Sequence, residues 1–457
     1  MTDESLIDED RYELDRATVR AIVAAAGAGS VTRLTELMEP LHAADIADLL
    51  EQVDSEQRLD ILRLFGGGID GEILSELDES IREEVIGALH PEVLGEAMRE
   101  LESDDVVDII EDLASHQQDM ILETLEDGDR VAVEQALAYP EHSAGRLMQR
   151  ELVAGPEHWT VGEAIDYLRS HDDLPEEFYH LILIDPRFRP TGYVTLGKIL
   201  GHPREQNLTE IVEDSFHPIE ALQEESEVAY AFNQYHLITA PVVDEEGRLV
   251  GVITIDDAMA VLDDEHEEDI LRLAGVDEES SLADRVIATI KRRFPWLAVN
   301  LVTAVLASLV IAQFEVAIAQ IVALAVLMPI VASMGGNAGT QSLTVAVRAI
   351  ATKDLTGANV WRVIRREVLV GLVNGVLFAV VMGIVGIIWF GSPALGAVIA
   401  VAMVINMVVA GLAGTVIPVL LERANIDPAL ASGAFVTTVT DVVGFFAFLG
   451  LAAVVLL

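Results

Sequence analysis

The sequence predicts a multidomain protein: an α-helical superhelical N-terminal domain, an α/β module built from two copies, a linker helix and a five-helix all-α transmembrane domain. Two observations support this fold class. From residue 296 onward six acidic and six basic residues balance, so the net charge of −48 belongs entirely to the preceding residues. Five apolar segments that are long enough to cross a bilayer as helices follow residue 295. A neutral hydrophobic part is therefore joined to a very acidic soluble part.

The charge and the missing cysteines exclude several classes of protein. Such an acidic surface repels phosphates, so we expect no nucleic-acid partner. Carboxylates suit hard divalent cations, although a solvated, salt-adapted surface is the alternative for most of them. The absence of cysteine excludes disulfides, thiolate metal sites and a cysteine nucleophile. The N-terminus is polar and has no signal-peptide core, which predicts a cytoplasmic soluble part.

Residues 1–142 are predicted to form an acidic, entirely helical domain. Apolar residues recur at helical spacing in short segments such as LHAADIADLLEQV and SIREEVIGAL, which acidic or Gly/Pro breaks separate. Short units that bury their faces on their neighbours are typical of an α-superhelix. His42, His90 and His116 are isolated, so we expect them to be solvated or to cap helices rather than to bind metal.

Residues 143–262 show one βαββα pattern twice, at about 143–202 and 208–262. Strand-like runs are expected at 180–184, 191–196, 240–244 and 248–255. The second copy, with PVVDEEGRLVGVITIDDAM, resembles a CBS domain, and the two copies resemble a tandem CBS pair, or Bateman module. This resemblance implies a candidate nucleotide site for ATP, with Thr254 and Asp257 at the ribose. In the first copy Lys198 stands where the acidic residue would be, which argues against a nucleotide there.

A linker helix is predicted over residues 263–294. It begins densely acidic and ends in Lys291, Arg292 and Arg293, just before the first apolar segment. Acidic residues at its start complement the helix dipole. The basic end is typical of a cytoplasmic membrane anchor.

The transmembrane domain is predicted over residues 295–457. We expect its spans at about 296–313, 316–334, 368–390, 394–421 and 429–457. The first and third loops contain no Lys or Arg, whereas the second and fourth are basic. The positive-inside rule then places the N-terminus in the cytoplasm and the C-terminus outside. The chain is thus predicted to pass several times through the lipid of the cell (inner) membrane.

Asp441 lies near the middle of the last span, which contains no Lys or Arg. An ionised Asp at this depth costs roughly 2.5–3.5 kcal/mol, so it normally faces protein, water or a cation. Thr437 and Thr438 precede it by one helical turn and give that face oxygen atoms. We expect a cation site here; the alternative is a helix-packing residue that is protonated or bonded to a neighbouring helix.

A glycine-rich segment, GGNAG, follows the second span at residues 335–339. A single helix over residues 316–350 would be about 52 Å long, against a hydrocarbon core of about 30 Å. The segment is therefore expected either to interrupt the span or to leave the membrane, and a packing motif of small residues is the other interpretation. In depth, we expect Asp441 to lie within a couple of helical turns of Gly335, Gly336 and Asn337. These residues together indicate a path for a cation.

These segments resemble one known family. The pattern P-x5-GGNxGxQ from Pro329 to Gln341, the DPALASG…TT..D run and the order of the domains are similar to the MgtE magnesium channels. The resemblance implies a homodimeric Mg²⁺ channel, not an enzyme. It implies pore residues at Asp441 and Asn337, and Asp427 at the inner mouth. It also implies a cytoplasmic Mg²⁺ sensor.

The sensor is expected to work through the acidic residues. Bound Mg²⁺ would bridge the N-terminal domain, the CBS pair and the linker helix, and so lock the pore shut. His236 and Ala260 occupy positions where the family suggests acidic ligands, so one regulatory site is expected to be weakened. The regulatory metal ligands are predicted to be Asp257, Asp263, Glu265, Glu268, Asp269, Asp104, Asp105 and Asp108.

Three other functions were weighed. The first is a secondary carrier for Mg²⁺, Co²⁺ or another divalent cation, coupled to protons through Asp441. The second is an enzyme of the membrane face, such as a phosphotransferase, but the sequence has no P-loop and no Ser/His/Asp set. The third is a nucleotide-sensing scaffold with a mere membrane anchor, which does not explain an Asp in an otherwise uncharged span.

Overall fold

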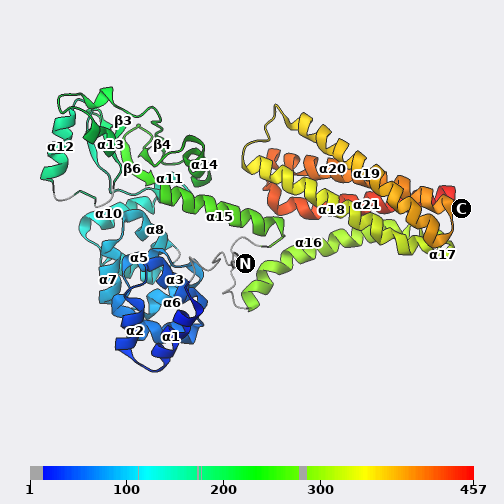
Figure 1. The fold of residues 1–457 in the computed structure, drawn as a ribbon, viewed down its shortest axis with the longest axis horizontal. Helices are drawn as coiled ribbons and strands as arrows, with labels where there is room; N and C mark the ends of the chain where they lie inside the picture. Colours follow the sequence, from blue (N-terminus) through cyan, green and yellow to red (C-terminus); the bar gives the residue numbers. More distant parts are fainter. Residues whose placement is uncertain (1–13, 112, 172–173, 176–177, 277–285) are drawn as a thin grey trace, which may run out of the picture. The chain divides into compact units, whose positions relative to one another are not determined.

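The computed structural model describes residues 14–111, 113–171, 174–175, 178–276 and 286–457 (Figure 1). It divides into two compact units, residues 1–265 and 266–457. Helices and two small sheets make up unit 1, and long apolar helices dominate unit 2. The predicted fold class is therefore confirmed.

The N-terminal part of unit 1 is a chain of short helices. Most of them pack on the helix two positions further along, as α2 does on α4, α4 on α6 and α5 on α7. Leucine and isoleucine side chains fill one continuous core between them. The helices are α1 (Arg16–Gly27), α2 (Val31–Met38), α3 (Ala43–Gln52), α4 (Ser55–Phe65), α5 (Gly71–Ser75), α6 (Glu79–Ala88), α7 (Pro91–Glu100), α8 (Ser103–Glu111), α9 (Ser115–Leu122) and α10 (Asp127–Ala136), with a 3-10 turn η1 (Gly66–Gly68).

Polar residues at the helix starts explain why the chain breaks into short pieces. The rings of His42 and His90 accept hydrogen bonds from the backbone N–H groups of Ala44 and Glu92 and so cap α3 and α7. These two histidines were expected to be solvated or to cap helices, and the structure shows the second of these roles. His116 lies in the first turn of α9 instead.

The second part of unit 1 contains two matching three-stranded sheets. In each sheet the first strand pairs parallel with the second, which pairs antiparallel with the third. Both antiparallel pairs carry a register shift at the same place, after Leu183 and after Val242. The first copy contains β1 (Ala154–Pro156), α12 (Val161–Ser170), β2 (His180–Ile184), β3 (Pro190–Thr195) and α13 (Leu196–Gly201); the second contains β4 (Ile219–Glu220), α14 (Glu225–Tyr235), β5 (Thr239–Val243), β6 (Leu249–Thr254) and the start of α15 (Ile255–Leu273). Two short elements, α11 (Ala144–Leu147) and the 3-10 turn η2 (Leu208–Glu210), complete this part.

The predicted linker helix lies in two helices. Its acidic half is the end of α15, which the structure starts eight residues before position 263 and ends at Leu273. Gly275 follows with a φ of +72°, a left-handed conformation that suits glycine and ends the helix. Its basic half is the start of α16 (Val286–Ala312). Residues 277–285 lie outside the described residues.

Unit 2 is built around α20, which packs against α18, α19 and α21, while α16 packs on α21. Within the described residues, five helices are long and apolar enough to cross a membrane. They are α16, α18 (Ala323–Ala351), α19 (Val360–Phe390), α20 (Pro393–Arg423) and α21 (Pro428–Val455); a short α17 (Glu315–Gln320) precedes α18. α18, α19 and α20 are longer than the predicted spans, mainly at the ends near the basic loops, whereas α21 is about as long as its predicted span.

The expected interruption at GGNAG is wrong, because α18 stays helical through residues 335–339. The span is shorter than a helix from residue 316 would be, since α17 forms a separate helix and α18 begins at Ala323. Its 29 residues measure about 43 Å, so an excess over the bilayer core remains.

Candidate functional site

The glycines of GGNAG bring α18 against α20 and α21. A Cβ atom at Gly335 would lie 2.1 Å from Nδ2 of Asn406 on α20, and one at Gly444 on α21 would lie 2.7 Å from the same atom. A Cβ atom at Gly339 would lie 2.6 Å from Val436 on α21. Only glycine permits these approaches, so the packing interpretation of the motif is supported.

These contacts put Asn337 and Asp441 at the same level of the helix bundle. Asn337 lies between the two contact positions on α18, and Asp441 lies between the two on α21. However, Asn337 is exposed and stands two residues from each contacting glycine, about 200° around the helix. A single chain therefore aligns the two residues in height without bringing their side chains into contact.

Asp441 is half-buried, and its carboxylate has no hydrogen-bond or ion-pair partner within the part of the chain that the structure describes. Thr437 and Thr438 lie on the same face and are also half-buried. Their hydroxyls donate to the backbone oxygens of Gly433 and Ala434, at 3.0 Å and 2.5 Å. Each hydroxyl oxygen keeps acceptor capacity, so this face offers acceptors and no charged donor.

The predicted inner mouth is tied to the end of α15. Asp427 caps α21 by accepting from the backbone N–H of Ala429 at 2.7 Å, and it pairs with Arg272 at 3.4 Å. Arg272 also contacts Glu268 at 2.7 Å. Burial, followed by the charge of Asp427, raises the pKa of Asp269. Negative charge therefore accumulates here around a single arginine.

An apolar contact accompanies these charges. Leu273, the last residue of α15, packs against a buried cluster formed by α18 and α21: Leu343, Val347, Ala429 and Val436. Both kinds of contact lie within unit 2, which contains the five candidate membrane spans and which we also call the membrane unit. The last turns of α15 are therefore part of this unit.

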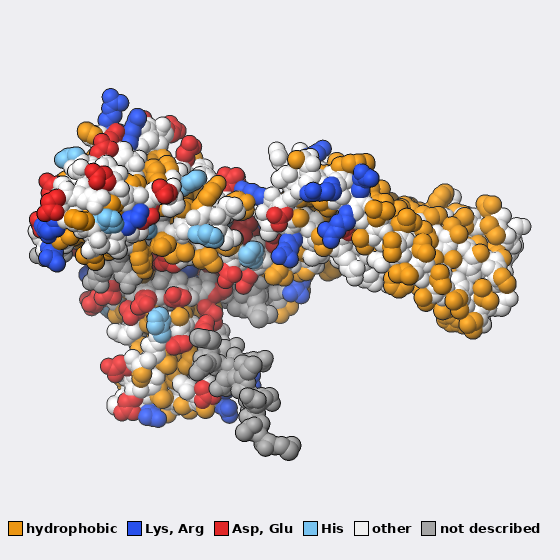
Figure 2. All heavy atoms as spheres, turned by 45° about the horizontal axis from the view of Figure 1, so that its top comes forward, with side chains coloured by type: hydrophobic (Ala, Val, Ile, Leu, Met, Phe, Trp, Pro, Cys, Tyr) orange, Lys and Arg blue, Asp and Glu red, His pale blue; other side chains and the backbone are white. Residues whose placement is uncertain are grey.

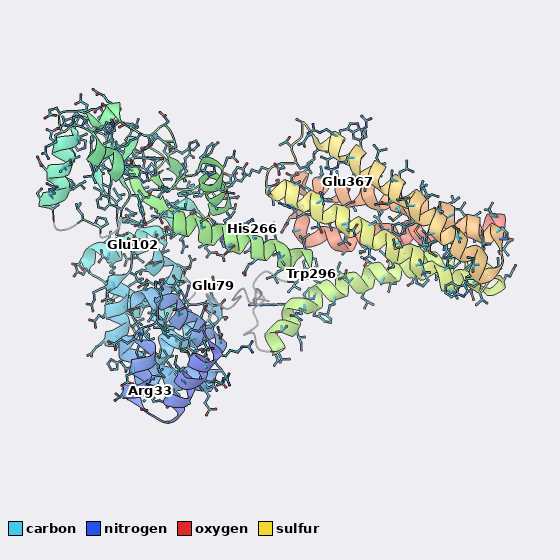
Figure 3. The ribbon with its side chains drawn as sticks, in the orientation of Figure 1. Arg33, Glu79, Glu102, His266, Trp296 and Glu367 are labelled. Atoms are coloured by element: carbon cyan, nitrogen blue, oxygen red, sulfur yellow. The ribbon has the colours of Figure 1, made fainter. Side chains whose placement is uncertain are left out.

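The sequence interpretation missed two polar residues inside the membrane unit. Asn406 is fully buried; its Nδ2 donates to the backbone oxygen of Val331 at 2.8 Å, and its Oδ1 has no partner among the described residues. Glu367 on α19 is buried and accepts from the Ser342 hydroxyl of α18 at 2.9 Å (Figure 3). A lone amide in an apolar span was the available signal for Asn406. Glu367 directly follows Arg365 and Arg366, so in the sequence it resembles part of the basic second loop.

The predicted sensor residues of unit 1 gather around the start of α8 and the start of α15. Asp104 is buried, and burial together with the charges of Asp257 and Asp105 raises its pKa well above the usual value. Burial and neighbouring carboxylates, Asp257 first among them, raise the pKa of Asp105 to about 7. Glu102, which was not predicted, also reaches a pKa of about 7, through burial and then Glu151 (Figure 3). We call Glu102, Asp104, Asp105, Asp256 and Asp257 together the α8 acidic cluster.

Other predicted regulatory residues lie differently. Asp108 pairs with buried Arg82 at 2.9 Å, so its charge is already compensated. Asp263 is exposed, Glu265 is half-buried, and Glu268 pairs with Arg272 as described. Among the described residues no three His, Asp or Glu side chains group closely enough to hold one ion directly. The α8 acidic cluster therefore fits a hydrated cation as a counter-ion better than a fully coordinated one.

The two candidate nucleotide positions differ. In the second copy Thr254 donates its hydroxyl to Asp257, so the two residues of the motif are adjacent. In the first copy Lys198 pairs with Glu213 at 3.0 Å, and this pair fills the equivalent place. His236 ends α14 in a left-handed conformation, with a φ of +53°, and Ala260 is exposed on α15.

Three family models match the chain: an MgtE intracellular N domain over residues 41–142, a CBS domain over 220–264 and MgtE, a divalent cation transporter, over 328–451. The magnesium transporter MgtE of Thermus thermophilus is 33% identical and covers 94% of this chain and 96% of its own. That of Bacillus subtilis is 29% identical, with coverage of 93% and 94%. A crystal structure of the cytosolic domain of the Mg²⁺ channel MgtE with ATP is 30% identical over 53% of this chain and 99% of its own, at a TM-score of 0.49. The chain belongs to the MgtE family of divalent cation transporters.

Proposed function

We propose that this protein is a Mg²⁺-selective channel of the cell membrane that conducts hydrated Mg²⁺ past Asp441 and that cytoplasmic Mg²⁺ closes. The observation that carries the proposal is the half-buried, unpartnered carboxylate of Asp441 inside an apolar helix. The free-energy cost of an ionised carboxylate in a bilayer is offset when a divalent cation lies beside it. The named function of the relatives, magnesium transport, agrees with this choice of ion.

Hydrated Mg²⁺ fits the chemistry of this face. Mg²⁺ gives up its water reluctantly, and the bound waters are hydrogen-bond donors. Asp441, Thr437 and Thr438 present acceptor oxygens to such donors. Two copies of the chain on a twofold axis would supply two carboxylates to one divalent ion. The exposed Asn337 at the same level would then add an amide oxygen from each copy.

Closure by Mg²⁺ is supported by the charges at both ends of α15. The α8 acidic cluster lies beside the first turn of α15. Burial, and after it the charges of neighbouring carboxylates, raise the pKa of Glu102 and of Asp105 to about 7, and a divalent counter-ion would lower this cost of ionisation. The last turn of α15 packs on the predicted inner mouth through Leu273 and the Arg272–Asp427 pair. A cation that fixes the first end would therefore hold the second end in place. ATP is proposed to bind at Thr254 and Asp257 of the second CBS copy only.

One observation favours the alternative, a proton-coupled carrier for Mg²⁺ or Co²⁺. Glu367 is a second carboxylate buried in the membrane unit, and proton-coupled transporters use such groups. Conductance that persists without a pH gradient would exclude the carrier. A reversal potential that does not change when a pH gradient is applied would also exclude it.

The test is Asp441→Asn, which keeps the shape of the side chain and removes its charge. We expect Mg²⁺ currents across a planar bilayer to fall by about a hundredfold or more, since roughly 2.5–3.5 kcal/mol is at stake. Glu315→Gln, at an exposed carboxylate of α17, is the matched control and should conduct normally. Normal currents in a correctly folded Asp441→Asn protein would remove Asp441 from the ion path.

A further inference from the structure

A cavity of about 310 Å³ lies between α19 and α20, at the end of the membrane unit that carries the basic loops. One face of α20 lines it with Val416, Val419, Leu420 and Arg423, which recur at helical spacing. Trp361 and Ile364 of α19 form the opposite wall. The cavity is therefore an apolar groove with a single cation at its end.

The rim of this cavity carries uncompensated positive charge. The Arg423 side chain makes no ion pair or hydrogen bond within the described residues, and the same holds for Arg362, Arg365 and Arg366 at the start of α19. In unit 1, by contrast, buried Arg58 and Arg82 pair with carboxylates. Glu422 adjoins Arg423 but does not line the cavity. Figure 2 shows the Lys and Arg side chains gathered at this end of the apolar unit.

Trp361 marks the depth of the cavity. Its side chain is 68% exposed although it is large and apolar. Tryptophan concentrates where a membrane meets water, because its ring is apolar and its N–H is polar. Apolar walls deeper in the groove and arginines at its rim repeat the order of acyl chain and phosphate in a phospholipid.

We propose that this cavity is a binding site for an anionic phospholipid of the leaflet on the side of the basic loops. The acyl chain lies in the groove against Val416, Val419 and Leu420, and the phosphate is held by Arg423 with help from the arginines of α19. The charge of the site selects the lipid: the chain carries −48 overall, yet among the residues that line this cavity the one charged side chain is Arg423, which has no ion pair within the described residues. Basic pockets between membrane helices have this chemistry.

The experiment uses the tryptophans of the full-length protein in lipid vesicles. The chain has four, so replacing Trp159, Trp296 and Trp389 with Phe leaves Trp361 as the only emitter. Bromine on the acyl chain quenches tryptophan on contact. The quenching of Trp361 is measured with brominated phosphatidylglycerol and with brominated phosphatidylcholine, each at the same low fraction in an unbrominated mixture of both lipids.

We expect the anionic lipid to occupy the site about fivefold more readily than the neutral one, as one arginine near an anionic surface implies. Arg423→Gln should reduce this preference, whereas Arg348→Gln, at an exposed arginine that does not line the cavity, should not. A variant that keeps only Trp389 is the second control. Trp389 is 60% exposed at the other end of α19, where no arginine lies nearby in sequence, and should be quenched equally by both lipids.

Two results would overturn the proposal. Equal quenching of Trp361 by both lipids, or an unchanged preference in Arg423→Gln, would show that the cavity does not select anionic lipid. Protection of Trp361 from both lipids would show that a second copy of the chain covers the groove instead. Circular dichroism and gel filtration of each variant confirm that it is folded before its quenching is compared. Ion conduction does not enter the measurement, so the result is independent of the proposed channel function.

Discussion

The two units of the protein bury their helices in different ways. In unit 1 branched aliphatic side chains such as Leu49, Leu50 and Ile61 are fully buried between the helices. Unit 2 also buries large side chains such as Leu327 and Phe448, but glycines in addition let its helix backbones touch. A Cβ atom at Gly414 of α20 would lie 2.5 Å from the backbone oxygen of Gly339 of α18. The difference follows from the solvent. Water drives unit 1 together through its apolar area, whereas lipid supplies no such force and leaves close packing and hydrogen bonds.

Carboxylates follow the same division. In unit 1 they crowd together in the α8 acidic cluster, where burial first and the charges of neighbouring carboxylates second raise their pKa. Inside the long helices of unit 2 they are few: Glu367 accepts from Ser342, and Asp427, at the start of α21, is bonded to the Ala429 N–H and to Arg272. Asp441, in the middle of α21, has no polar partner among the described residues. Crowded carboxylates favour the binding of a regulatory counter-ion, whereas a single carboxylate without a partner suits an ion that passes through.

The largest effect is expected from a substitution that disrupts the glycine packing of unit 2. Gly335→Ala would place its Cβ atom 2.1 Å from Asn406, so we expect a destabilisation of about 3 kcal/mol. The neighbouring Gly336→Ala is the matched control, because nothing lies within 4 Å of its position. Alanine there should stabilise the helix by about 0.5–1 kcal/mol. The fraction of folded protein after heating in detergent measures both, and equal loss in the two variants would contradict this packing.

A somewhat smaller effect is expected where a single carboxylate joins two helices. Glu367→Ala leaves the buried Ser342 hydroxyl without its acceptor and should cost about 1.5–3 kcal/mol. Glu367→Gln keeps an acceptor oxygen and should cost clearly less. The same heating assay compares them, with transport measured in parallel. Equal losses in both variants would mean that the charge of Glu367, rather than its hydrogen bond, holds α18 against α19.

The α8 acidic cluster predicts a dependence on pH. Because folding raises the pKa values of Glu102 and Asp105 to about 7, the folded state binds more protons than the unfolded state between about pH 4 and 7. The contribution of these groups to stability is therefore present at low pH and is lost as the pH rises through this window. Mg²⁺ should restore it above pH 7.

Thermal unfolding of unit 1, followed in the full-length protein at pH 5.5 and 8 with and without Mg²⁺, checks this expectation. Stabilisation by Mg²⁺ should be larger at pH 8, and Asp105→Asn should reduce the difference. Na⁺ at equal ionic strength controls for general screening. A Mg²⁺ effect that is the same at both pH values would contradict the role of the cluster.

Much of the architecture could be predicted from the sequence because its signals are periodic and local. A short run of apolar residues located β2 at residues 180–184, and length with apolar composition located the spans. The two interpretations of GGNAG could not be separated from the sequence, because glycines that open a backbone and glycines that let helices touch look alike there. Only the opposing Asn406 of α20, some seventy residues away, distinguishes the two uses.

The candidate sites were predictable as types of residue but not as partners. The sequence indicated that Asp104, Asp105 and Asp257 belong together, and they do approach one another. It could not reveal that Asp108 is neutralised by Arg82, since the two residues lie on different helices of the superhelix. The Arg272–Asp427 pair was hidden for the same reason, although each residue lies in a segment that had been singled out.

That pair supplies the smallest expected effect. Arg272 and Asp427 are partly exposed, so their attraction is worth about 1 kcal/mol or less. Arg272→Gln also leaves Asp427 and Asp269 without the cation between them, so the end of α15 should be repelled from the inner mouth. The cytoplasmic Mg²⁺ concentration that half-closes the proposed channel should then rise by up to about fivefold. Arg293→Gln, at an exposed arginine without an ion pair in the described residues, controls for the loss of one positive charge near the membrane. A half-closing concentration that stays unchanged would mean that Leu273, rather than the ion pair, holds α15 in place.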